Sequence, residues 1–163
     1  MNTLNFDAQG HLFPYDLIET EWKPFADTFG WNDHRHTLIE LFYSFLNKLN
    51  DLSINEFTLW IDGSFVTRKE HPNDIDAVVV LPTPIYRQFE KHLRTLREQF
   101  DGLDIYFVRL ISEEEPDYFL YVSDRAEWLF QFTMTKPDRV TRRKFPKGFL
   151  QLIWNNESAL QRT

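Results

Sequence analysis

Apolar residues follow helical and strand periods in alternating segments of this chain. The clearest helical pattern runs from residue 33 to residue 49, where leucine and phenylalanine side chains form one stripe. Helices are also predicted over 21–29, with Thr20 as N-cap and Gly30 as the stop, over 85–100, and over 124–132, with Ser123 as N-cap. Short apolar runs predict strands over 57–61, 74–80, 103–110 and 148–154.

The order of these elements predicts the fold class. A strand, a helix and a second strand follow one another between residues 74 and 110, and such a crossover places the two strands in one sheet. We therefore expect an α/β (α+β) domain with a mixed β-sheet and helices packed mainly on one face. The length of 163 residues suits a single domain over 1–163, with an N-terminal arm and short helix over 1–31 and a basic loop over 136–147.

Composition narrows the class of protein. Aromatic residues make up 17% of the chain, so we expect a core rich in phenylalanine and tryptophan. The chain has no cysteine, which excludes disulfides and thiolate metal sites. The sequence shows neither a secretory signal nor an apolar run long enough to cross a membrane. We therefore expect a cytoplasmic protein without a membrane partner.

The charge is acidic overall but unevenly distributed. A net charge of −7 argues against loose, charge-driven binding to nucleic acid or to an acidic membrane. The segment 136–147, however, holds six lysine and arginine residues and one aspartate. A solvated loop is the ordinary explanation of such a run. If the segment folds over a site, Arg142, Arg143 and Lys147 are candidates for binding a triphosphate or a polyanionic acceptor.

Two carboxylates stand at the start of the strand 74–80. Because successive side chains of a strand point to opposite faces, Asp74 and Asp76 share a face. Like charges this close raise each other's proton affinity unless a cation neutralises them, and Mg²⁺ suits oxygen ligands. Upstream, Gly63 allows a sharp turn and the close approach of a ligand. Ser64 begins a turn whose N–H groups and hydroxyl suit phosphate oxygens.

The spacing of these motifs is similar to that of a known superfamily. Gly63-Ser64, nine further residues, and then Asp74-Ile75-Asp76 leading into an apolar strand resemble the signature of the DNA-polymerase-β-like nucleotidyltransferase superfamily. The resemblance implies that the Gly-Ser turn binds a triphosphate and that Asp74 and Asp76 hold two Mg²⁺ ions, with Mn²⁺ as a substitute. It also implies a third carboxylate on a neighbouring strand, a role that fits Asp104. The whole chain is also similar to small bacterial proteins that carry the phrases DGSFVT and PNDID, a likeness that implies no substrate.

The resemblance implies a reaction in which a nucleoside monophosphate is transferred from a nucleoside triphosphate to a hydroxyl acceptor. The acceptor stays open between an RNA end, a protein hydroxyl, a small molecule and an antibiotic. The chain is too short for the separate helical domain of larger superfamily members, so other classes also stay open. These are a nucleotide-binding protein without activity, a toxin–antitoxin or phage-defence component that acts through a partner protein, and an interaction module with a vestigial site.

Each motif also has a purely structural interpretation. An Asp-x-Asp pair can close a turn after Pro72-Asn73, and an aspartate in the position of Asp104, just after a glycine turn, is often a strand-end residue. Ser64 as a helical cap uses the same exposed amides as a phosphate site, so these two roles are compatible. The five histidines show no metal-ligand spacing with a carboxylate partner, and we treat them as surface or hydrogen-bonded positions. His71 is the exception, because it lies between the Gly-Ser turn and the Asp-x-Asp pair.

Overall fold

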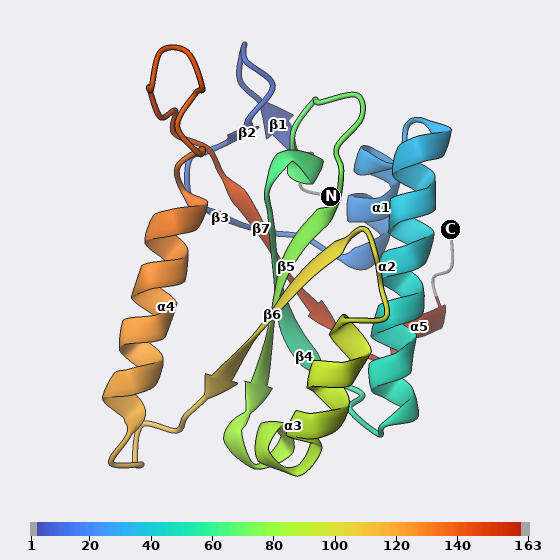
Figure 1. Cartoon of the computed structure of the whole chain (residues 1–163), viewed down its shortest axis with the longest axis vertical. Coiled ribbons are helices and arrows are strands. Elements are labelled where there is room, and N and C mark those ends of the chain that lie inside the picture. The colour runs from blue at the N-terminus through green and yellow to red at the C-terminus, as the bar shows by residue number, and fades with distance from the viewer. Residues whose placement is uncertain (1–2, 161–163) are drawn as a thin grey trace.

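The computed structural model describes residues 3–160 and contains a five-stranded mixed sheet in the order β3-β7-β4-β5-β6 (Figure 1). A separate two-stranded sheet pairs β1 with β2. The predicted α/β (α+β) class is therefore confirmed. The strands are β1 (Asn5–Phe6), β2 (Leu12–Phe13), β3 (Leu17–Glu19), β4 (Phe57–Asp62), β5 (Ile75–Pro82), β6 (Leu103–Leu110) and β7 (Phe149–Trp154). The helices are α1 (Trp22–Phe29), α2 (Asp33–Asp51), α3 (Thr83–Arg97), α4 (Tyr118–Phe132) and α5 (Asn156–Leu160), and Ser64–Val66 form a 3-10 turn, η1.

The predicted crossover forms the middle of the sheet. β5 runs antiparallel to β4 and parallel to β6, and α3 connects β5 to β6. The side chains of Val78 and Val79 point to opposite faces and both are fully buried, which explains the unbroken apolar run over residues 77–81 of β5. The last residue of β4 and the first residues of β5 and β6 consequently meet at the same end of the sheet.

One face of the sheet carries the larger hydrophobic core. Helices α1, α2 and α3 supply buried side chains to it, and α2 does so along the stripe that its periodicity predicts. Asn32 caps α2 by accepting a hydrogen bond from the N–H of Arg35 at 2.9 Å. The ring of Trp22 in α1 lies 5.1 Å from that of Trp154 in β7, so tryptophan joins the helices to the sheet. The expectation of an aromatic-rich core is confirmed.

The opposite face is covered in part by α4. A smaller hydrophobic cluster lies beneath this helix and includes Trp60, Val78, Val108, Phe132 and Phe149. The rings of Phe132 in α4 and Phe149 in β7 lie 5.4 Å apart. Helices α1, α2 and α3 thus pack on one face and α4 on the other, in keeping with the expected packing mainly on one face. No helix within residues 3–160 is both long enough and apolar enough to span a membrane.

Two predicted helix starts are wrong. α1 has Glu21 as its N-cap, and Thr20 instead donates its backbone N–H to the carbonyl of Gln151 at 2.9 Å, extending the pairing of β3 with β7. α4 begins at Tyr118, so Ser123 lies inside the helix. Tyr121, in the turn before Ser123, packs against the smaller hydrophobic cluster and favours this earlier start. The predicted stop at Gly30 is confirmed, since Gly30 donates to the carbonyl of Ala26 at 3.0 Å.

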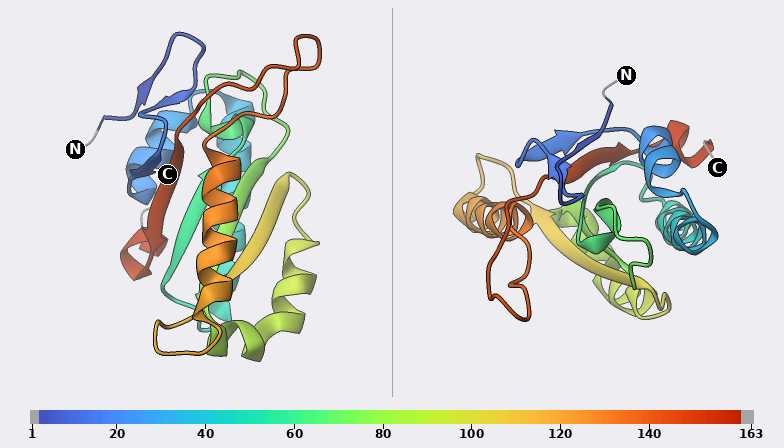
Figure 2. Two further views of the ribbon diagram at one scale, coloured as in Figure 1. Left: turned by 90° about the vertical axis from the view of Figure 1, so that its left-hand side faces the viewer. Right: turned by 90° about the horizontal axis from the view of Figure 1, so that it is seen from above.

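Loops from distant parts of the chain gather where β4 ends and β5 and β6 begin, which we call the loop end of the sheet (Figures 1 and 2). The β1–β2 hairpin, the segment between β4 and β5, and the segment between α4 and β7 all lie there. The N–H of Gly148 donates to the carbonyl of Leu12 at 2.8 Å, and the N–H of Arg68 donates to the carbonyl of Gly10 at 2.9 Å. The N-terminal arm therefore bridges the other two segments.

Candidate functional site

Aspartates stand side by side on adjacent strands at the loop end of the sheet. The Cα of Asp62 in β4 pairs with that of Asp76 in β5, and the Cα of Asp76 pairs with that of Asp104 in β6. Their side chains share the face under α4, because the alternate residues of each strand belong to the hydrophobic cluster on that face. Asp74 precedes Asp76 by two residues and has the same side-chain parity. We call these four residues the carboxylate row.

The turn after β4 brings the backbone against the carboxylate row. Gly63 has a φ of 76°, in the left-handed region that favours glycine. A Cβ at this position would collide with the carboxyl group of Asp76. The sharp turn expected at Gly63 is therefore confirmed, and the group that approaches it in this structure is the Asp76 carboxylate. The approach of a ligand to the amides of this turn stays a prediction.

Asp62 is joined to the end of the basic segment by a buried ion pair. The Nζ of Lys147 donates to Oδ1 of Asp62, and the two side chains are only 7% and 10% exposed. Burial raises the pKa of Asp62, and the charge of Lys147 opposes that shift. The backbone N–H of Lys147 donates to the carbonyl of Thr133 at 2.9 Å, which ties the end of α4 to the same point. Lys147 thus lies beside the carboxylate row and is the ion-pair partner of one of its members, Asp62.

The carboxylate row concentrates negative charge around Asp76. Burial, followed by the neighbouring charges of Asp74, Asp62 and Asp104, raises the pKa of Asp76 to about 6. The ammonium group of Lys136 opposes this shift. Mutual repulsion of the Asp-x-Asp pair is the property that the sequence predicts. The structure places the expected Asp104 beside this pair and adds Asp62, which the sequence does not single out. Local cations neutralise the row only in part.

Asp104 is oriented by a residue of its own strand. The hydroxyl of Tyr106 donates to Oδ2 of Asp104 at 3.2 Å. The ring of Tyr106 lies 5.0 Å from that of Trp128 in α4, so the helix supports the donor. Burial and then the charge of Asp104 raise the pKa of Tyr106, which keeps its hydroxyl protonated. Sequence analysis does not single out Tyr106, although its two-residue offset from Asp104 places both on one face.

Ser64 begins η1 directly after Gly63. Within residues 3–160 its hydroxyl has no hydrogen-bond partner. In the same part of the chain, the backbone N–H groups of η1 donate to no side chain. The residue is only partly buried. The predicted phosphate-binding groups therefore lie next to the carboxylate row.

Arg35 holds the segment after the turn against α2. Its buried guanidinium donates to the carbonyl of Lys69 at 2.6 Å and also to the carbonyl of Phe65. The group stacks 3.8 Å from the ring of Trp31 and 4.4 Å from that of Phe65. Burial lowers the pKa of Arg35 to about 10. The sequence pattern does not single out Arg35, because an arginine in an amphipathic helix ordinarily faces solvent.

The basic segment forms an ordered hairpin, residues 134–146, which we call the basic hairpin. Met134 and Pro146 form an isolated bridge, and the N–H of Thr135 donates to the carbonyl of Phe145 at 2.8 Å. Arg142 and Arg143 are exposed near its tip. Within the described chain neither is in an ion pair with the carboxylate row, and their binding of a triphosphate stays a prediction.

The carboxylates have the chemistry of a divalent-cation site. No group of three or more histidine, aspartate or glutamate side chains in residues 3–160 is arranged to hold a metal ion as it stands. The donors are all carboxylate oxygens, however, and they carry charge that the protein leaves partly unneutralised. Asp74, Asp76 and Asp104 therefore match Mg²⁺ in the type of their donor atoms.

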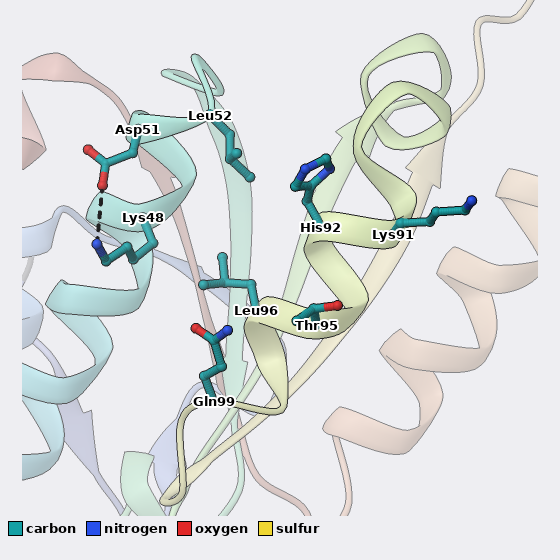
Figure 3. Close-up of a pocket in the computed structure, with 8 residues that line it drawn as sticks. All are labelled: Lys48, Asp51, Leu52, Lys91, His92, Thr95, Leu96 and Gln99. Atoms are coloured by element: carbon teal, nitrogen blue, oxygen red, sulfur yellow. Dashed lines mark ion pairs between the residues drawn. The ribbon is translucent and has the colours of Figure 1, made fainter.

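A surface groove between α2 and α3 is separate from the carboxylate row (Figure 3). Lys48 and Asp51 form an ion pair of 3.5 Å on its α2 side, and His92 and Leu96 line its α3 side. No member of the carboxylate row lines it. The groove therefore contributes nothing to the candidate site.

The fold and its row of carboxylates define an α+β protein with an acidic site at one end of its sheet. Residues 4–153 match a family described as Family of unknown function (DUF6932), and the chain belongs to this family. No curated protein and no solved structure matches the chain. The family match contains the whole carboxylate row and the basic hairpin, so both lie within the segment that defines the family.

Proposed function

We propose that this protein transfers a nucleoside monophosphate from a nucleoside triphosphate to a hydroxyl acceptor. The observation that carries the proposal is the strand register, which sets Asp62, Asp76 and Asp104 side by side next to the Gly63 turn. The resemblance of the Gly-Ser and Asp-x-Asp motifs to the DNA-polymerase-β-like superfamily supports the same interpretation. We also propose a cytoplasmic location, in keeping with a chain that contains no cysteine.

The proposed site divides its work between carboxylates and the turn. Asp74, Asp76 and Asp104 are the residues that would hold Mg²⁺, with Mn²⁺ as a substitute, and the bound ions would supply neutralisation of phosphate charge. The backbone N–H groups after Gly63, together with the Ser64 hydroxyl, bind the β- and γ-phosphates. Nucleoside triphosphate and acceptor then meet on the face of the sheet under α4.

The chemical step is an in-line displacement at phosphorus. The acceptor oxygen forms a bond to the α-phosphorus, the bond from that atom to the bridging oxygen breaks, and pyrophosphate leaves. Asp104 accepts the proton of the acceptor hydroxyl, and the hydrogen bond from Tyr106 keeps its carboxylate in place. Lys147 and Lys136 limit the repulsion among the carboxylates, so the row stays folded before substrate arrives.

A second candidate function is nucleotide binding without transfer, in a protein that acts through a partner. The observation that favours it is the outer surface of α4, where Phe119 is 65% exposed and Phe130 is 72% exposed. Exposed large apolar side chains on one helix are typical of protein–protein contact surfaces. Under this alternative the carboxylate row and the Gly63 turn bind nucleotide, and no pyrophosphate is released.

Label transfer separates the two functions. The wild type, Asp76→Asn and the control Asp117→Asn are incubated with Mg²⁺, each α-phosphate-labelled nucleoside triphosphate and a set of hydroxyl acceptors. Asp117 is exposed at the start of α4 and makes no side-chain cap, so its neutralisation changes the charge alone. We expect Asp76→Asn to abolish transfer and the control to retain it. Transfer at the wild-type rate by Asp76→Asn contradicts the mechanism, and binding without transfer by the wild type supports the second candidate.

A further inference from the structure

The basic hairpin is held in shape by its own backbone and by the side chains of Thr135, Asp138 and Thr141. The N–H of Asp138 donates to the carbonyl of Arg143 at 2.8 Å, and the N–H of Arg142 donates to the carbonyl of Asp138 at 2.9 Å. Oδ1 of Asp138 accepts from the N–H of Val140 at 3.0 Å and from that of Thr141 at 2.7 Å. The hairpin projects from the loop end of the sheet (Figures 1 and 2). Hydrogen bonds within the hairpin therefore fix the conformation of its tip without a ligand.

The hairpin presents cations that have no ion-pair partner within the described part of the chain. They are Lys136, Arg139, Arg142, Arg143 and Lys144, and all are exposed. The carboxylate of Asp138, the one acidic side chain of the hairpin, accepts hydrogen bonds from the tip. In a chain with a net charge of −7, this surface concentrates positive charge that suits an external anion.

Exposed aromatic rings lie beside the hairpin. Phe13 is 51% exposed, and Tyr15 and Phe145 are each 40% exposed. The ring of Phe145 lies 6.3 Å from that of His11, and the rings of Phe13 and Tyr15 lie 5.4 Å apart. The contact of Phe145 with His11 places the base of the hairpin against the N-terminal arm. The exposed rings of Phe13 and Tyr15 follow His11 in that arm, and Lys144 precedes Phe145 in the hairpin. Cations that follow phosphates and rings that stack on unpaired bases are the two elements of single-strand binding surfaces.

Both ends of the hairpin are anchored beside the carboxylate row. At the first end, Lys136 is near enough for its charge to act on Asp62 and Asp76. At the second end, the chain continues into Lys147, which is paired with Asp62. The tip lies further from the row than either end. An anion bound along the hairpin can therefore extend from the tip to the row.

We propose that the basic hairpin, with the exposed rings of Phe13, Tyr15 and Phe145, binds a single-stranded nucleic acid and delivers its terminal hydroxyl to the carboxylate row. The proposal rests on the proposed function, since it identifies the acceptor class of that reaction. The phosphates lie along the hairpin cations, and the bases stack on the rings.

The arrangement suits a single strand better than other polyanions. A nucleoside triphosphate concentrates its charge at one point, whereas the cations of the hairpin are spread from its base to its tip. A duplex keeps its bases stacked and so offers no free base to the rings. An anionic membrane or an acidic peptide supplies charge without bases. The combination of spread cations and exposed rings therefore favours a single strand.

Fluorescence anisotropy tests the proposal directly. Labelled single-stranded RNA and DNA of about 12 nucleotides, a length within the range of single-strand binding sites, are titrated with protein in the absence of Mg²⁺ and nucleotide. We expect Arg142→Ala/Arg143→Ala to weaken binding about tenfold and to flatten the salt dependence by about 1.4 in log–log slope, for two lost phosphate contacts. Phe13→Ser removes one stacking ring and is expected to weaken binding about tenfold without changing that slope.

Matched variants control for charge and for folding. Arg87→Ala/Lys91→Ala removes the same charge from exposed positions of α3 and is expected to leave binding unchanged. Circular dichroism on each variant verifies that the fold is retained. Asp74→Asn/Asp76→Asn is expected to bind the single strand at least as tightly as the wild type, because the hairpin cations are intact.

The binding experiment and the label-transfer experiment together distinguish failure of this proposal from failure of the proposed function. Equal binding by the wild type and by Arg142→Ala/Arg143→Ala overturns it, as does equal affinity for single strand and duplex. Hairpin-dependent binding to phosphatidylserine vesicles or polyglutamate, without binding to the oligonucleotides, also overturns it. Hairpin-dependent oligonucleotide binding with no label transfer from any nucleoside triphosphate supports the hairpin as a binding surface and contradicts nucleotidyl transfer.

Discussion

Replacing Asp76 with asparagine is expected to stabilise the metal-free protein at neutral pH. The pKa of Asp76 rises from its ordinary value of 3.8 to about 6 on folding, because of burial and then the charges of Asp74, Asp62 and Asp104. Between these two pH values the folded chain binds more protons than the unfolded chain, so ionisation of Asp76 costs stability as the pH rises. The cost is absent below about pH 4 and complete above about pH 6. The variant, which cannot ionise at this position, avoids it.

The size of the effect follows from the pKa shift. Each pKa unit corresponds to about 1.4 kcal/mol, so a shift of this size sets an upper limit of about 3 kcal/mol. Asp76 is only partly buried, and solvent screening reduces the expected difference to about 1–2 kcal/mol. Mg²⁺ should reverse the order of stability, because it is expected to stabilise the wild type and to have little effect on the variant.

Urea denaturation at a series of pH values measures this difference. Wild type, Asp76→Asn and the exposed control Asp117→Asn are unfolded between about pH 4 and pH 7.5, the span that covers both pKa values, without metal and then with Mg²⁺. The account predicts that the gain from Asp76→Asn vanishes at the acid end and is full at the neutral end. A gain that does not change with pH, or a loss at pH 7.5, would refute the electrostatic argument.

Three further substitutions test the supports of the site. Gly63→Ala is expected to destabilise the fold by about 2 kcal/mol or more, from its positive φ and the collision with Asp76, and an unchanged melting temperature would contradict this. Lys147→Met leaves Asp62 charged, buried and unpaired, at a cost of about 3–5 kcal/mol, and Lys147→Met/Asp62→Asn is expected to recover most of it in a double-mutant cycle. Arg35→Met removes the donors to Phe65 and Lys69, so hydrogen exchange over residues 64–70 should accelerate, whereas Arg35→Lys should have an intermediate effect.

The strands of the site could be predicted because their signals are local. Alternation and apolar content alone predict the strand 103–110 and the strand that follows the Asp-x-Asp motif. The structure forms both strands, as β6 and β5. The crossover through α3 also follows from element order, since parallel neighbours need such a connection. These features depend on a few consecutive residues and on general rules of chain topology.

The remaining parts of the site depend on long-range contacts. Asp62 reads as an ordinary turn residue before Gly63, and its register with Asp76 and its pairing with Lys147 appear only when β4 joins β5 and β7. Arg35 contacts Lys69, which lies 34 positions further along the chain. No periodicity or spacing within a short window reports such partners. The start of α4 was missed for a similar reason, because packing against the sheet decided it.

The central claim is that the carboxylate row and the Gly63 turn bind a metal–nucleotide complex. Calorimetric titration of each of the four nucleoside triphosphates with Mg²⁺, into the wild type and into Asp74→Asn/Asp76→Asn, tests it most directly. The account predicts binding that requires both the metal and the two carboxylates, with the exposed control Asp117→Asn unaffected. Absence of binding to the folded wild type, or equal binding to the double variant, would contradict it.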